Sequence, residues 1–207
     1  MQDGELIKIM EHFINYKNYK IPVLYEDNHV IAVAKPHGIL SQSDISGVED
    51  ILSIIKEDIK IRYNKPGNVF LGLVHRLDRN TGGTMIFAKT SKGASRLSEQ
   101  LRNKKMLKGY FAIAHGNPEQ RKAFLRNKLE KNEQENIVRE PVNGKECILY
   151  YETVKSVGNS TLIFAVPITG RTHQIRAQMA FAGYPLVGDS KYGRKCVDNS
   201  KRFELAL

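Results

Sequence analysis

The spacing of apolar residues along the chain predicts four helices. Apolar side chains recur three or four positions apart in residues 4–17, 48–61, 91–107 and 170–183, which is the pattern of a helix with one buried face. Two acidic residues suit the start of the second helix, and Gly183 suits the end of the fourth. We therefore expect a short amphipathic helix near the N-terminus and three more along the chain.

Runs rich in Val, Ile, Tyr and Phe predict the strands. These runs cover residues 28–35, 69–74, 84–89, 109–115, 146–157 and 161–166. Gly158 and Asn159 separate the last two runs and supply a hairpin turn, which makes this pair antiparallel. Because strands and helices do not alternate in a regular βαβ rhythm, the predicted class is α+β, with a mixed, largely antiparallel central sheet flanked by helices. No linker or repeat interrupts the chain, so we expect a single domain over residues 1–207.

The composition excludes several classes of protein. Of the 207 residues, 41% are hydrophobic and 26% are charged, so the chain can fill a core and is not a disordered tail. No apolar run approaches the roughly 18 residues of a membrane span, and the N-terminus lacks the order of a secretory signal. We therefore expect a cytoplasmic protein. Cys147 and Cys196 lack the paired spacing of a zinc site and are interpreted as reduced thiols.

Basic residues outnumber acidic ones by 32 to 22, and the excess is concentrated in one segment. Residues 89–108 hold seven bases and one acid, and residues 119–131 hold five bases and two acids. A run of this kind is as often a solvated helix face as a surface that follows an RNA backbone. Charge alone does not separate the two interpretations.

The most unusual polar segment lies between two predicted strands, at residues 75–83. It reads HRLDRNTGG and places Asp78 two residues after Arg76 on a glycine-containing loop, where an ionised carboxylate can reach solvent. Taken alone, such a segment is more often a turn that Asp78 caps, with Arg76 on the surface. It is not a phosphate-binding loop, because the Lys-Ser/Thr pair of such loops is absent.

Three other segments carry candidate chemistry. GRTHQIR, residues 170–176, opens the fourth predicted helix; a start near Thr172 would place its first amides and Arg171 where an anion binds. Tyr110 follows the basic segment and either packs in the sheet or stacks on an unpaired base. GYPLVGDSKYG, residues 183–193, has the composition of a tight turn that leads into a strand. No histidine pair has the spacing of a metal site.

Taken together and in this order, five segments resemble the RluA-type pseudouridine synthase family. HRLDRNTGG followed by MIFAK is similar to the family's catalytic loop, and KGYFAIAHG is similar to its tyrosine strand. GRTHQIR and GYPLVGDSKYG are similar to its third and fourth signatures, and VIAVAKPHGIL to the start of its catalytic domain. The resemblance covers residues 25–207. It implies an isomerase that converts specific uridines of ribosomal or transfer RNA to pseudouridine.

The resemblance also implies roles for single residues. Asp78 matches the aspartate that attacks the uridine, at the ribose or at the base, and Arg176 matches the arginine that pairs with it. Tyr110 matches the tyrosine that lies against the base, and Ile175 matches an aliphatic residue beside it. Arg76 matches the side chain that fills the gap left by the flipped nucleotide. No cofactor or metal is implied, since pseudouridine is an isomer of uridine.

The residues expected to contact RNA come from the loop, the basic segment and the fourth predicted helix. They are His75, Arg76, Thr81, Lys104, Lys105, Lys108, Arg171, His173, Gln174 and Ile175. We expect RNA as the partner and a monomer as the form that binds it. The basic segment would then follow the RNA backbone beside the catalytic loop.

The chain departs from the family at three places. Gly83 stands where serine is usual, and Gln178 stands where histidine is common. The chain also ends in KRFELAL, residues 201–207, where relatives continue, so its C-terminal end is interpreted as shortened. Residues 1–24 are interpreted as an N-terminal extension that is too short for the small RNA-binding domain of many relatives. These differences keep open a second hypothesis, a non-catalytic RNA-binding factor with the same fold.

Overall fold

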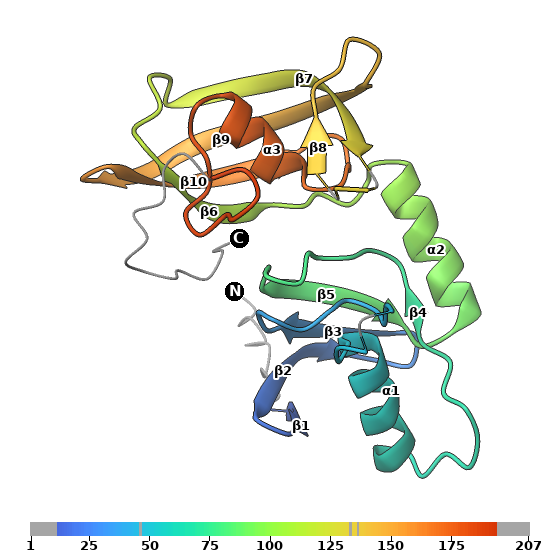
Figure 1. The fold of residues 1–207 in the computed structure, drawn as a ribbon. Coiled ribbons are helices and arrows are strands. Elements are labelled where there is room, and N and C mark those ends of the chain that lie inside the picture. The colour runs from blue at the N-terminus through green and yellow to red at the C-terminus, as the bar shows by residue number, and fades with distance from the viewer. Residues whose placement is uncertain (1–11, 46, 133, 136, 194–207) are drawn as a thin grey trace, which may run out of the picture. The chain divides into compact units, whose positions relative to one another are not determined.

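The computed structural model describes residues 12–45, 47–132, 134–135 and 137–193. The chain divides between residues 106 and 107 into two compact units (Figure 1). Each unit holds one five-stranded sheet, so the prediction of one central sheet is wrong. All pairs between the named strands are antiparallel. The predicted α+β class is confirmed, and the single domain stays a prediction.

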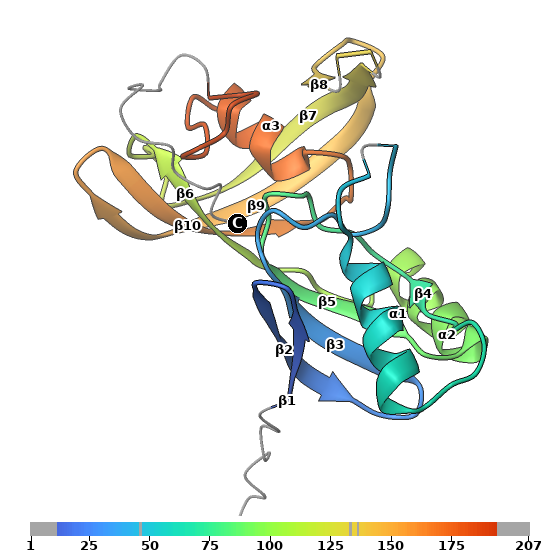
Figure 2. The same cartoon turned by 60° about the horizontal axis from the view of Figure 1, so that its bottom comes forward.

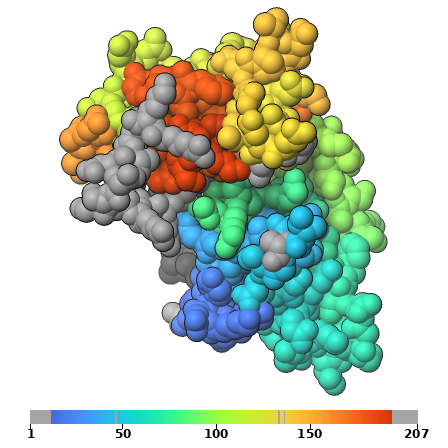
Figure 3. Space-filling model, viewed as in Figure 1, coloured from blue at the N-terminus to red at the C-terminus, as the bar shows by residue number. Residues whose placement is uncertain are grey.

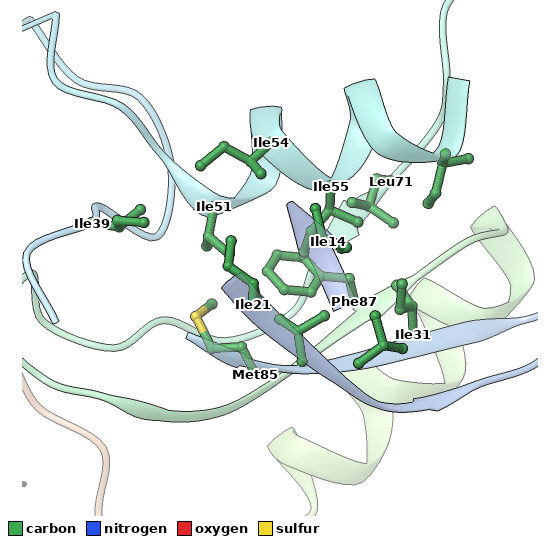
Figure 4. Close-up of a cluster of buried hydrophobic side chains, with 13 residues drawn as sticks. Ile14, Ile21, Ile31, Ile39, Ile51, Ile54, Ile55, Leu71, Met85 and Phe87 are labelled. Atoms are coloured by element: carbon green, nitrogen blue, oxygen red, sulfur yellow. The ribbon is translucent and has the colours of Figure 1, made fainter. Parts of the chain in front are cut away.

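The sheet of the first unit has the strand order β1-β2-β3-β5-β4. The elements of this unit are β1 (His12–Tyr16), β2 (Tyr19–Glu26), β3 (Val30–Lys35), α1 (Ile51–Arg62), β4 (Gly72–Leu73), β5 (Gly83–Ala88) and α2 (Ser91–Arg102). Helix α1 lies against the sheet, as Figure 2 shows, and its Ile51 and Ile55 pack with Met85 and Phe87 of β5 (Figure 4). This buried cluster holds in place β5 and the loop that leads into it.

The two helices of the first unit begin at side-chain caps. The Asp50 carboxylate accepts a hydrogen bond from the amide of Ser53 at 2.9 Å, and the Thr90 hydroxyl accepts one from Gly93 at 3.1 Å. Each cap satisfies an amide that has no partner inside the helix. Both predicted helices are confirmed, although the second ends at Arg102, before the last residues of the basic segment.

The predicted N-terminal helix is wrong over the residues that the structure describes. Residues 1–11 lie outside them, and His12–Tyr16 is a strand that pairs with β2. Ile14 and Ile21 stand opposite each other in this pair and both are buried, so the hairpin packs alternate positions rather than a helical face. Residues 12–24 therefore belong to the first sheet and are not an extension outside it.

The sheet of the second unit has the strand order β6-β10-β9-β7-β8. The elements of this unit are β6 (Tyr110–His115), β7 (Lys122–Asn132), β8 (Ile137–Arg139), β9 (Lys145–Val157), β10 (Ser160–Pro167) and α3 (Gln174–Phe181). The predicted hairpin is confirmed, with Val157 opposite Ser160. Helix α3 packs on one face of the sheet, where Ile175 and Met179 join the buried cluster.

The sequence prediction misses strands β2, β7 and β8. In β7, exposed Lys122 and Arg126 alternate with the half-buried Ala123 and Leu125. The second basic run, residues 119–131, therefore lies largely on one sheet strand, and some of its charge is paired across the sheet, as in the 3.1 Å contact of Lys122 with a glutamate of β9.

Candidate active site

Asp78 lies on the loop between β4 and β5, as the sequence predicts, and its side chain is half-buried. The amide of Thr81 donates to the Asp78 carbonyl at 3.0 Å, which closes a tight turn at this position. Arg76, two residues earlier, is exposed. The loop therefore presents a carboxylate that is partly shielded from water next to a cation that solvent reaches.

The backbone just before Asp78 is held by the segment that follows β3. The hydroxyl of Ser41 accepts a hydrogen bond from the amide of Leu77 at 3.0 Å and donates to the carbonyl of the same residue at 2.6 Å. One side chain thus satisfies both backbone groups of the residue that precedes Asp78. Two such bonds restrict the peptide from which the carboxylate projects.

The backbone just after Asp78 is held by the same segment. The amide of Gly38 donates to the carbonyl of Arg79 at 2.9 Å, and the Arg79 Nε donates back to the Gly38 carbonyl at 3.0 Å. The ammonium of Lys35 donates to the Arg79 carbonyl as well, at 3.2 Å. Asp78 is therefore flanked on both sides by residues that residues 35–41 hold, and this restricts its direction.

Lys35 is a buried cation next to this loop, with 1% of its surface exposed. Its ammonium also donates to the carbonyls of Pro36 at 2.9 Å and of Ile39 at 2.8 Å. Burial lowers the pKa of Lys35 to about 8, and the charge of Asp78 acts in the opposite direction. Sequence reasoning missed this residue; the available signal is a lysine that closes an otherwise apolar strand directly before a proline.

The other two loop residues with predicted RNA contacts, His75 and Thr81, are less exposed than Arg76. The ring Nε2 of His75 accepts a hydrogen bond from the amide of Ile86 at 3.0 Å. Thr81 is 2% exposed, and within the described residues its hydroxyl has no hydrogen-bond partner. Contacts of His75 and Thr81 with RNA stay predictions. A contact with RNA requires an exposed side chain, and Arg76 is exposed.

Gly83 has a local reason to replace the serine that is usual in the family. Its φ is +140°, a backbone conformation that L side chains rarely adopt. Glycine therefore suits the end of the loop at the point where β5 begins.

Tyr110 and Ile175 come together in the second unit. Tyr110 is the first residue of β6, stands opposite Ala165 of β10 and is half-buried. It packs on the cluster to which Ile175, 7% exposed, belongs. Both residues therefore belong to one hydrophobic cluster, and their predicted places beside the base stay predictions.

The predicted helix over residues 170–183 begins later than expected. His173 has a left-handed backbone, with φ at +52°, and the helix starts at Gln174. The buried Gln174 side chain accepts hydrogen bonds from the amide of Arg171 at 3.0 Å and the hydroxyl of Thr169 at 2.9 Å, and donates to a carbonyl of β9 at 3.0 Å. Its amide group is thus used within the fold, while Arg171 is exposed.

Arg176 forms a buried, two-pronged ion pair with Asp189. Its Nε and Nη2 donate to the two carboxylate oxygens, each at 2.8 Å, and the Asp189 side chain is fully buried. Burial alone would raise the pKa of Asp189, but the hydrogen bonds and charge of Arg176 outweigh it and hold this pKa below its usual range. Asp78 belongs to the first unit and Arg176 to the second, so their predicted pairing stays a prediction.

Asp189 and Tyr192 are residues that sequence reasoning missed as parts of the site. The segment 183–193 was predicted as a tight turn, and the amide of Asp189 does donate to the carbonyl of Leu186 at 3.2 Å. The prediction did not include the contact of this turn with Arg176. The available signal is an aspartate and a tyrosine between two glycines in a segment that resembles a family signature.

The lysines of the basic segment, residues 89–108, differ in exposure and in pairing. Lys104 and Lys105 are exposed in the turn after α2, and Lys108 is half-buried. Lys89, by contrast, is paired with Glu26 at 2.7 Å. The exposed lysines remain available for a polyanion, and their contact with RNA stays a prediction.

Neither a metal cluster nor a membrane-spanning helix is found in the part of the chain that the structure describes. No group of three or more His, Cys, Asp or Glu side chains there is placed to hold a metal ion. None of the helices in the described ranges is long and apolar enough to cross a membrane. Cys147 is a buried free thiol, and Cys196 lies outside the described residues.

A family model for RNA pseudouridylate synthases matches residues 29–181. The chain belongs to this family. The matched range includes Asp78, Tyr110 and Arg176, and the family predicted from the sequence is confirmed. The pseudouridylate synthase match also includes residues 35–41, which hold the Asp78 loop.

Two bacterial proteins are similar to most of this chain. Ribosomal large subunit pseudouridine synthase C of Buchnera aphidicola subsp. Baizongia pistaciae is 41% identical over 179 residues, which are 85% of this chain and 55% of the relative. Ribosomal large subunit pseudouridine synthase D of Borreliella burgdorferi is 35% identical over 198 residues, 92% of this chain and 60% of the relative. The chain therefore spans little more than half the length of these relatives.

Solved structures show the same fold. The structure of human RNA Pseudouridylate Synthase Domain Containing 4 matches with a TM-score of 0.70 and 24% identity, over 82% of this chain and 68% of that one. That of Domain Containing 1 matches with a TM-score of 0.71 and 19% identity, over 100% and 78%. At this level of identity the likeness concerns the fold alone.

Proposed function

We propose that this chain isomerises specific uridines in RNA to pseudouridine, with Asp78 as the nucleophile. The observation that carries the proposal is the family match over residues 29–181, which spans the Asp78 loop, Tyr110 and Arg176. The hydrogen bonds that hold the backbone on both sides of Asp78 support it, because a nucleophile must be directed as well as ionised.

The reaction breaks two bonds and forms two. The bond from the ribose anomeric carbon to N1 of uracil breaks and a bond from the same carbon to C5 forms, while the hydrogen at C5 leaves as a proton and N1 takes up a proton, so the product is an isomer of the substrate. In the proposed mechanism the Asp78 carboxylate forms a transient covalent bond with the ribose or the base, which divides one difficult step into two. Tyr110 lies against the base, and Arg176 is the proposed partner of the Asp78 carboxylate.

The target base must leave its stack before either bond can be reached. Flipping costs a few kcal/mol, which contacts with the protein must offset. Arg76 is exposed two residues before Asp78, so its side chain is free to reach into the RNA from the same loop. We propose that it fills the space that the flipped nucleotide leaves.

Among RNA classes, we propose ribosomal RNA of the large subunit before transfer RNA. Both relatives described above are named as ribosomal large subunit synthases. The net charge of +10 and the exposed Lys104 and Lys105 suit a long polyanion whose backbone they would follow.

The test uses transcripts of large-subunit RNA that carry tritium at C5 of uridine, so that isomerisation releases tritium. We expect the protein to release tritium and Asp78→Asn to reduce release to background, with RNA affinity in filter binding within about twofold of the original. Asp58→Asn is the matched control, because it removes the same charge from helix α1 of the same unit, where Asp58 pairs with Arg62 at 2.7 Å. The control should retain full release.

Two outcomes would contradict the proposal. RNA binding without tritium release from ribosomal or transfer RNA would favour the non-catalytic RNA-binding factor. Equal release by Asp78→Asn and by the unmodified protein would remove Asp78 from the reaction.

A further inference from the structure

The guanidinium of Arg176 is held from two directions by one short turn. The Asp189 carboxylate meets its edge through Nε and Nη2, each at 2.8 Å, and the ring of Tyr192 lies 5.4 Å from its central carbon. A two-pronged carboxylate fixes the plane and the direction of a guanidinium, and an aromatic ring restricts its tilt. The turn therefore determines where the arginine points.

The carboxylate that performs this role is itself preorganised. One oxygen of Asp189 also accepts hydrogen bonds from the amide of Lys191 at 3.0 Å and from the amide of Tyr192 at 3.2 Å. The carbonyl of Asp189 accepts from the amide of Gly193 at 2.9 Å. The side chain is fully buried, so water does not compete for these contacts. Arg176 thus meets a carboxylate that backbone amides of its own turn also hold.

The Tyr192 ring is anchored at its far end. Its hydroxyl accepts a hydrogen bond from the amide of Val138 in β8 at 2.8 Å and lies 3.0 Å from Nδ1 of His173. Figure 3 shows the segment of α3 and the following turn, in orange-red, directly beside the segment around β8, in yellow. The rings of His173 and Tyr192 also meet edge to face, with centroids 5.8 Å apart. The start of α3 and the turn therefore support each other next to Arg176.

Stability alone is a weak explanation for this arrangement. Removing two charges from water costs several kcal/mol per ion, and their attraction often repays this cost only in part. An apolar pair of similar volume would hold α3 on the sheet as well, as Ile175 and Met179 already do. What an apolar pair cannot do is orient a charged group.

We propose that Asp189 and Tyr192 are positioning residues that fix the guanidinium of Arg176 for the isomerisation. The proposal rests on the function proposed above, in which Arg176 acts on the Asp78 carboxylate. The segment 183–193 then orients Arg176 as well as forming a turn. Neither positioning residue is required to touch the uridine.

The test is Asp189→Asn, which keeps the shape of the side chain and removes its charge. We expect the single-turnover rate of tritium release to fall about 10- to 100-fold, while RNA affinity stays within about twofold, because a small misplacement of a catalytic group has effects of this size. A variant that is only less stable would instead lower the urea midpoint of unfolding and leave the rate per folded molecule unchanged.

The control is Glu152→Gln, which breaks the exposed ion pair with Lys122 in the same unit and should leave the rate unchanged. If the unmodified protein releases tritium and Asp189→Asn matches it in rate, the positioning role is overturned while the proposed function stands. If the unmodified protein releases none, the proposed function fails first.

A second pair of variants tests the same role should Asp189→Asn not fold. Tyr192→Phe keeps the ring beside Arg176 and should retain the rate within about threefold, whereas Tyr192→Leu removes the ring and should lose about tenfold. Equal rates for the two variants would overturn the contribution of the ring.

Discussion

Replacing Lys35 by methionine tests how a buried cation supports the Asp78 loop. The substitution keeps an unbranched stem in a site where Lys35 is 1% exposed, and it removes the ammonium. Three carbonyls then lose a donor, those of Pro36, Ile39 and Arg79. The Ile39 carbonyl is bound in a buried contact, and the Arg79 carbonyl keeps the amide of Gly38.

Two opposing terms set the size of the effect. A buried carbonyl without a donor costs about 2 kcal/mol at mid-range, so the loss at two carbonyls, or at three if Arg79 is counted in full, costs about 4–6 kcal/mol in the free energy of unfolding. Methionine also removes the cost of holding a buried ammonium. Burial lowers the pKa of Lys35 from 10.5 to about 8, which corresponds to about 3 kcal/mol at 1.36 kcal/mol per unit. We therefore expect Lys35→Met to lower stability at pH 7 by about 1–3 kcal/mol.

The pH dependence separates the two terms. Between pH 8 and 10.5 the unfolded chain keeps the proton of Lys35 and the folded chain has lost it. The unfolded state then binds more protons, so the stability of the unmodified protein rises with pH through this window. Lys35→Met lacks this gain. The stability difference between the two proteins should therefore widen by about 2–3 kcal/mol from pH 7 to pH 10.

Urea unfolding followed by far-ultraviolet circular dichroism at pH 7 and pH 10, at one ionic strength, measures this difference. Titration of other groups affects both proteins and cancels in the comparison. Lys60→Met, on the exposed side of α1, is the control and should stay within about 0.5 kcal/mol of the unmodified protein. A difference that stays constant or narrows between the two pH values would refute the reasoning.

Three further predictions concern the caps, the turn and the basic segment. Thr90→Ala should lower the urea midpoint by the equivalent of about 1 kcal/mol, because the N-cap bond of α2 is lost, and Thr90→Ser should restore it. Gly193→Ala should cost about 1–3 kcal/mol in unfolding and slow tritium release, because its Cβ would lie 2.5 Å from the backbone oxygen of Asp189. Replacing Lys104 and Lys105 by glutamine should weaken binding of many RNA sequences alike and reduce the slope of log affinity against log salt by about one per lysine. A slope that does not change would remove the two lysines from the interface.

Local signals in the sequence predicted much of the fold. The turn residues Gly158 and Asn159 between β-rich runs predicted a hairpin, and β9 and β10 form it. The two helices of the first unit carry apolar positions at helical spacing and a capping side chain, and both are present where they were expected. Such elements follow from the sequence because propensity, periodicity and turn chemistry agree over a short stretch.

Other elements depended on partners far along the chain. Phe13 and Ile14 fit a helical face, yet pairing with β2 made this segment a strand. Strand β7 shows exposed basic residues, which read equally well as a solvated surface, and its pairing with β9 decided its conformation. A strand is stabilised by its neighbour, so its own residues describe it only in part.

The site divides in the same way. By itself, the sequence determined the family and the chemical types, a carboxylate on a loop, a tyrosine on a strand and an arginine on a helix. The tertiary structure decided which residues hold them. Lys35 donates a hydrogen bond to the carbonyl of Arg79, 44 residues along the chain, and Asp189 pairs with Arg176, 13 residues earlier in the chain. The physical reason is that a hydrogen bond or ion pair depends on distance and direction, which only the packed chain sets.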